Sequence, residues 1–258
     1  CQENHRVCST IYIKNKNPNP PVENRGNRGN EIKMTNVLLV AAIALPSGDV
    51  PLLVEKALRK LNCRTLLFSL EEDLPLLELV RYRGPNDFHR SRFNRRLMRT
   101  IKRFQPDILF IYGSNWGIFP KTLQKIKNRT RCKIVIWEEN LYYWQWYQCL
   151  SFPYYDYFFS TDSYAIPLLA KPSTGLKNVY FLGQGCDPDE HGRVKLSEEE
   201  KKRFEAEITF IGGGRPRRRQ LFEHLTRYRL KLWGWGWDES EILKPFAVKE
   251  TVFGLKKT

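Results

Sequence analysis

The chain has 258 residues, which is enough for one large or two modest domains, and its composition is that of a globular protein. No apolar run reaches the roughly 20 residues of a membrane-spanning helix, and the six cysteines are scattered without a C-x-x-C pair, which argues against a zinc site or a disulfide framework. The 43 basic residues outnumber the 28 acidic ones, and the net charge of +15 favours an anionic partner: a phosphorylated ligand, a nucleic acid or an anionic membrane surface.

Residues 1–33 differ in composition from the rest of the chain. The segment NKNPNPPVENRGNRGN is rich in Asn, Pro and Gly and has no periodic apolar face, so it can bury little surface. The first methionine, Met34, comes just before the first apolar run. We therefore expect 1–33 to be a disordered tail or translated upstream sequence.

The run VLLVAAIAL, residues 37–45, is the longest apolar stretch. It is too short to span a membrane, and Lys33 alone supplies a basic flank, which is weak for a signal peptide. We interpret the run as a buried strand. Since scattered thiols are typically reduced, we expect a cytoplasmic protein.

From Met34 onward, short apolar runs alternate with amphipathic stretches. Strands are expected at 36–44, 64–70, 107–112, 133–137, 156–160 and 178–182. Helices are expected at 50–61, 92–104, 119–128 and 162–170. Strands that are apolar throughout and separated by helices are typical of a parallel sheet covered on both faces. The pattern predicts an α/β fold with a Rossmann-like N-terminal domain over 34–190.

A polar linker, 191–206, leads to a second unit at 207–258. This unit starts with a strand, three glycines, a helix at 216–226 and the strand RLKLWGW. It is too short to close a sheet of its own. We therefore expect the incomplete beginning of a second Rossmann-like domain.

The stretch ITFIGGGRPRRRQLFEHL combines an apolar run, a glycine loop and an arginine cluster. Glycines let the backbone approach a ligand closely, and Pro216 suits the first turn of a helix whose N-terminus attracts anions. The spacing fits neither G-x-G-x-x-G nor G-x-x-x-x-G-K-[ST]. The residues alone leave a phosphate site and a plain turn with solvated arginines equally open.

The segments FIGGGRPRRRQLFEHL and LKLWGWGW resemble the start of the C-terminal domain in CgeB-type (spore-maturation protein) glycosyltransferases. Upstream, YDYFFSTDSYAIPLLAKPSTGLKNVYFLGQGCDPDEH resembles the end of that family's N-terminal domain, and PDILFIYGSN and IVIWEEN fit the same domain. The motifs are short, but their order and spacing match the family from about Met34 to about Trp237. The resemblance implies a GT-B architecture, with two Rossmann-like domains facing across a cleft.

The resemblance further implies a nucleotide-diphosphate sugar as co-substrate, bound mainly by the C-terminal domain, with no metal or cofactor. Basic side chains and helix N-termini replace the cation electrostatically in such sites. Gly212 and Arg218 match the family's loop glycine and arginine at the donor phosphates. The backbone of Gly213 and Gly214 belongs to the same predicted site, and Arg215 is a further candidate.

The acceptor-side candidates are Ser47, Gly48, Asp49, Glu138, Glu139 and Asn140. Glu138 or Glu139 follows a strand and is either a base toward an acceptor hydroxyl or a carboxylate at a helix start. Asp49 either approaches the cleft or caps the next helix. The family often carries an acidic pair and a proline here, and this chain does not match that pattern fully. No catalytic residue and no stereochemical outcome is assigned.

Two further features have competing explanations. Asp187-Pro-Asp189 has the form of a metal-binding D-x-D, but that motif belongs to another glycosyltransferase architecture, so no metal is expected. The basic stretch 81–103 is a solvated helix face, a contact for an anionic or polymeric acceptor, or a peripheral membrane contact at the inner face.

The leading hypothesis is therefore a metal-independent glycosyltransferase that acts on an anionic or polymeric acceptor, such as one of the cell envelope. The family's later acidic motif would lie beyond Thr258, so we expect this chain to be inactive by itself. The alternatives are a non-catalytic polyanion-binding protein and an inactive truncated relic. Specific nucleic-acid binding is not expected, because no helix-turn-helix, RRM or zinc-finger signature is present.

Overall fold

The computed structural model describes residues 34–41, 49–69, 87–113, 117–139, 150–193 and 195–248. The segment 1–33 and the site candidates Ser47, Gly48 and Asn140 lie outside the described residues. Asp49 is the first residue of a helix, but the position of its side chain is not described.

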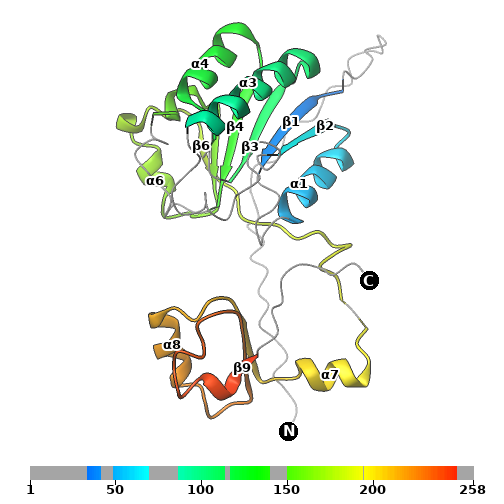
Figure 1. Ribbon diagram of the computed structural model, residues 1–258, viewed down its shortest axis with the longest axis vertical. Coiled ribbons are helices and arrows are strands. Elements are labelled where there is room, and N and C mark those ends of the chain that lie inside the picture. The colour runs from blue at the N-terminus through cyan, green and yellow to red at the C-terminus, as the bar shows by residue number, and fades with distance from the viewer. Residues whose placement is uncertain are drawn as a thin grey trace, which may run out of the picture. The chain divides into compact units, whose positions relative to one another are not determined.

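Six parallel strands form the larger sheet (Figure 1). They are β1 (Asn36–Ala41), β2 (Arg64–Ser69), β3 (Ile108–Tyr112), β4 (Lys133–Glu138), β5 (Tyr157–Ser160) and β6 (Val179–Phe181). Their order is β2-β1-β3-β4-β5-β6, and every neighbouring pair is parallel. The order reverses between β1 and β3, which is the topological switch point of a doubly wound fold. The expected α/β class with a Rossmann-like parallel sheet is confirmed.

Helices cover both faces of this sheet. α3 (Asp87–Phe104) and α4 (Pro120–Arg129) lie on one face, and α1 (Asp49–Lys60) lies on the other (Figure 1). Because side chains alternate along a strand, β1 sends Leu38 toward the cluster beneath α3 and α4 and Leu39 toward the cluster beneath α1. This two-sided burial explains why the strands are apolar throughout.

The helix expected at 162–170 is reduced to α6 (Ile166–Leu169). Two side-chain contacts hold a turn in front of it: Ser160 Oγ accepts from the Asp162 N–H at 3.1 Å, and Asp162 Oδ1 accepts from the Tyr164 N–H at 2.9 Å. Such bonds compete with helical ones, so the helix begins late. The short 3-10 helices η3 (Phe152–Tyr154) and η4 (Pro172–Thr174) flank this region.

The segment expected to be a polar linker, 191–206, contains a helix, α7 (Glu198–Phe204). Ser197 and Glu200 form a capping box, in which each side chain accepts from the other residue's backbone N–H. The S-x-x-E pattern at this position is the sequence signature of such a cap. The assignment of 191–206 as a linker stays a prediction, and the structure adds that part of this segment is helical.

A second, smaller parallel sheet has the order β7-β8-β9. Its strands are β7 (Ile208–Ile211), β8 (Leu230–Trp233) and β9 (Ala247–Val248), with α8 (Pro216–Glu223) between the first two and the 3-10 helix η5 (Lys244–Phe246) before the third. The helix expected at 216–226 thus ends three residues early. Trp237 is fully buried in the core of this unit and meets the rings of Phe210 and Phe222 edge-on. Among the described helices, none combines the length and apolar character that a bilayer crossing requires.

Candidate functional site

Two loops follow the adjacent strands β7 and β8 at the same edge of the smaller sheet. The glycine loop, 212–214, was predicted as a phosphate site, and the tryptophan loop, 234–236, lies between Trp233 and Trp237. The strands are in parallel register, with Ile211 opposite Trp233. Both loops therefore leave the sheet at its carboxyl edge, where open α/β sheets bind ligands.

Hydrogen bonds join the two loops. The Gly212 N–H donates to the Trp233 carbonyl at 2.8 Å, and the Gly214 N–H donates to the Trp235 carbonyl at 2.8 Å. The buried indole N–H of Trp237 donates to the Gly212 carbonyl at 2.8 Å. The N–H groups of Gly212 and Gly214 are therefore engaged in pairing the two loops, and the phosphate-binding role of Gly212, Gly213 and Gly214 stays a prediction.

The glycines permit this close approach of the loops. A Cβ at Gly213 would lie 2.6 Å from the indole of Trp235, and one at Gly234 would lie 2.5 Å from the Gly212 carbonyl oxygen. Gly234 also has φ +122°, a conformation that L side chains rarely adopt. The glycines thus allow the two loops to pack against each other.

Arg219 fastens the two loops together. Its Nη1 donates to the carbonyls of Gly214 at 2.6 Å and Gly236 at 3.1 Å, and to Glu239 Oε2 at 2.6 Å. The sequence showed that an arginine lies here but not that its hydrogen bonds link the two loops. Nothing in the local pattern distinguishes it from its neighbours, because its partners lie on a separate loop.

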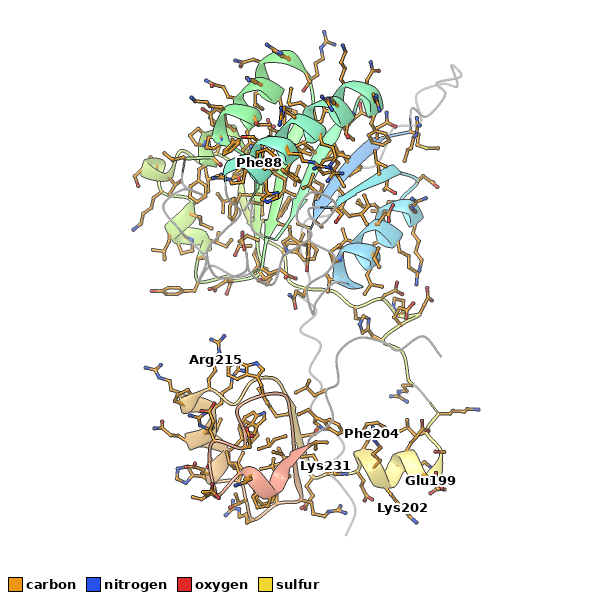
Figure 2. All side chains as sticks on the ribbon, viewed as in Figure 1. Phe88, Glu199, Lys202, Phe204, Arg215 and Lys231 are labelled. Carbon is orange, nitrogen blue, oxygen red and sulfur yellow. The ribbon has the colours of Figure 1, made fainter. Side chains whose placement is uncertain are left out.

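The other arginines of the cluster remain at the surface. Arg218 Nη1 donates to the Gly213 carbonyl at 3.0 Å, and its guanidinium lies 5.2 Å from the centre of the Phe210 ring. Arg215, at the N-cap of α8, and Arg217 make no ion pair or side-chain hydrogen bond within the described residues. Figure 2 shows the Arg215 side chain extending outward from the loop. Three guanidinium groups are therefore exposed at the start of α8.

Trp235 is exposed against the glycine loop that precedes these arginines. Its side chain is 61% exposed, whereas Trp233 and Trp237 are buried, and its indole lies against Gly213. The sequence suggested packing of Trp233 or Trp235 without deciding between them. The structure places an exposed aromatic surface against the glycine loop that leads into the three exposed arginines, an arrangement that suits a ligand with a ring and an anionic group.

Glu138 and Glu139 lie at the carboxyl end of β4, near the middle of the larger sheet. Glu138 is only 2% exposed. Glu139 Oε1 accepts hydrogen bonds from the Tyr112 hydroxyl and from Gln184 Nε2, the latter at 2.8 Å. The Glu139 carbonyl accepts from Thr161 Oγ1 at 2.9 Å. The Glu139 carboxylate is therefore held in one orientation at the ligand-binding edge of the sheet.

Burial, together with the hydrogen bond to Glu139, raises the pKa of Tyr112 above its usual range. The phenol therefore stays protonated and remains a donor. Tyr112 and Gln184 were not predicted as site residues, because they come from the end of β3 and the segment after β6, and only the fold brings them to Glu139. The roles of Glu138 and Glu139 toward an acceptor stay predictions.

Both carboxylates of the Asp187-Pro-Asp189 motif form ion pairs with lysines. Lys56 on α1 lies 2.8 Å from Asp187 Oδ2 and 3.0 Å from Asp189 Oδ2, and Lys60 lies 2.9 Å from Asp189 Oδ2. The ammonium groups of Lys60 and Lys56 lower the pKa of Asp189 to about 2. These ion pairs tie the segment after β6 to α1, which is a structural role for both carboxylates.

No protein-family model and no curated protein matches the chain. Among solved structures, it is similar to one from Listeria monocytogenes described as a UDP-N-acetylglucosamine 2-epimerase, with 13% identity, a TM-score of 0.49, and 82% of this chain and 64% of that chain covered. It is also similar to MnaA of S. aureus in a co-structure with UDP, with 14% identity, a TM-score of 0.47, and coverage of 83% and 64%. The chain thus spans less than two thirds of either structure, and likeness at this level does not assign a function.

Proposed function

We propose that this chain is part of a GT-B-type glycosyltransferase that uses a nucleotide-diphosphate sugar without a metal ion. The observation that carries the proposal is that three exposed arginines, Arg215, Arg217 and Arg218, follow the glycine loop against which the exposed indole of Trp235 lies. In this proposal, 207–258 belongs to the donor side. The resemblance of the same segment to CgeB-type enzymes supports the assignment.

The chemistry of a nucleoside diphosphate matches this surface. Guanidinium groups pair with phosphate oxygens in a bidentate manner, and an indole stacks on a base or a sugar. Positive charge beside the diphosphate stabilises the leaving group when its bond to the sugar breaks, which is the task of the metal ion in other transferases. Arg215 and Arg217 have no competing partner among the described residues, so they are free for this role.

On the acceptor side, formed by 34–190 in this proposal, Glu139 is the candidate base. Tyr112 and Gln184 both donate to the same oxygen of its carboxylate, which leaves the second oxygen to accept a proton from an acceptor hydroxyl. The hydroxyl oxygen would then bond to the anomeric carbon as the diphosphate departs. The high positive charge of the chain supports an anionic or polymeric acceptor.

Calorimetric titration of the full chain with UDP and with GDP tests the donor site. We expect at least one nucleotide to bind, and Arg215→Gln and Arg217→Gln each to weaken the binding about tenfold, as expected when a charge-assisted hydrogen bond of about 1.5 kcal/mol is lost. Arg227→Gln, an equal change of charge at an exposed arginine elsewhere in the same unit, is the control. Equal losses in all three variants would mean that only general charge attracts the nucleotide.

A further inference from the structure

A groove of about 1040 Å³ lies between α3 and α4. These two helices cover the face of the larger sheet opposite α1 (Figure 1). Two rows of cations line it: Arg95 and Arg99 from α3, and Lys121, Lys125 and Arg129 from α4. Residues four apart lie above one another on a helix, so each row follows its helix along the groove.

Within the part of the chain that the structure describes, these five cations have no anionic partner. None of them makes an ion pair within the described residues, and none of the residues that line the groove is acidic. Lys127 on the same helix behaves differently, because its ammonium group lies 2.7 Å from Asp156 Oδ1. Like charges four apart on a helix repel one another, and an anion between the rows relieves that repulsion. The groove is therefore complementary to a ligand with negative charge.

The groove also has an apolar component. Met98, Phe119, Tyr154 and Leu150 contribute to its lining, and Leu150 is 58% exposed. Phe88 precedes Arg95 by two helical turns and is 68% exposed (Figure 2). A polyanion such as a nucleic acid or an acidic polysaccharide would satisfy the cations but would leave these apolar groups in water. A lipid phosphate carries its charge on an apolar body and satisfies both.

We propose that the groove between α3 and α4 is a docking surface for an anionic phospholipid bilayer. Lipid phosphates bind between the two rows of cations, while Phe88 and Leu150 enter the interface. This contact is independent of the donor site proposed above, since it involves neither the glycine loop nor its arginines. Such a contact would hold the chain at the membrane surface.

Co-sedimentation of the full chain with vesicles tests the proposal. We expect binding to vesicles that contain phosphatidylglycerol and none to pure phosphatidylcholine. The double variant Arg99→Gln with Lys125→Gln removes one cation from each row. At about fivefold per basic residue, its binding should fall about 25-fold.

The control is Lys171→Gln with Lys177→Gln, which removes the same charge from two exposed lysines without ion pairs in the described chain. Its binding should change much less than that of the groove variant, and circular dichroism verifies that both variants fold. Equal losses in the two variants, or no preference for phosphatidylglycerol, would overturn the proposal.

A second pair of substitutions separates a bilayer from a polyanionic chain. Phe88→Ala with Leu150→Ala keeps every charge, so it should weaken vesicle binding several-fold while leaving heparin binding unchanged. If vesicle binding is also unchanged in this variant, the surface recognises charge alone and the bilayer is the wrong partner.

Discussion

The contact between the glycine loop and the tryptophan loop makes a sharp prediction about Gly234. In Gly234→Ala, the new Cβ would stand 2.5 Å from the Gly212 carbonyl oxygen, and the neighbour is backbone that cannot rotate away. The substitution also forces alanine into φ +122°. Backbone strain of this kind costs about 1–3 kcal/mol, and overpacking adds about 1–3 kcal/mol. We therefore expect the free energy of unfolding to fall by about 2–6 kcal/mol.

Urea unfolding followed by tryptophan fluorescence measures this change, because three tryptophans lie at the two loops. Gly185→Ala is the matched control: a Cβ there meets nothing within 4 Å, and no positive φ is required. Reduced freedom of the unfolded chain should leave that variant neutral or slightly stabilised. If Gly234→Ala were as stable as Gly185→Ala, the two loops would not be in the contact described here.

Three further outcomes are expected. Trp235→Ala should change the free energy of unfolding by less than about 0.5 kcal/mol, because the side chain is exposed. It should weaken nucleotide binding in calorimetry by about 1–3 kcal/mol, because one stacked ring is lost. An unchanged affinity would show that Trp235 is not part of the donor site. Tyr112→Phe removes a hydrogen-bond donor to Glu139 and should lower the free energy of unfolding in urea by about 1.5–3 kcal/mol. In the wild-type protein, the Tyr112 phenol should not ionise in a spectroscopic pH titration until the protein unfolds. The lysine partners of Asp189 lower its pKa from 3.8 to about 2, so the stabilising contribution of this carboxylate is present above about pH 4 and is lost as the pH falls toward 2. The thermal midpoints of wild type and Asp189→Asn should therefore converge over that range. A constant difference between the two midpoints would contradict the ion pair.

The sequence predicted those parts of the site that have a local signal in the chain and missed those that have none. Glu138 and Glu139 follow an apolar run, so their place at the carboxyl edge of a parallel sheet follows from the strand assignment alone. Tyr112 and Gln184 are far from them in the chain and carry no local signal. The helix α7 was missed despite its S-x-x-E cap, because the charged segment around it has no apolar periodicity.

The sequence by itself determined the α/β class and the parallel sheet, because buried strands and amphipathic helices must show their burial in local apolar patterns. Tertiary structure alone decided how each polar group is used. The N–H groups of Gly212 and Gly214 pair the two loops. Arg219 links these loops through hydrogen bonds, whereas Arg215 stays exposed. The side chain of Trp235 is exposed as well. These outcomes depend on contacts between segments about 20 residues apart, and a local pattern contains no information about the distant partner of a given side chain.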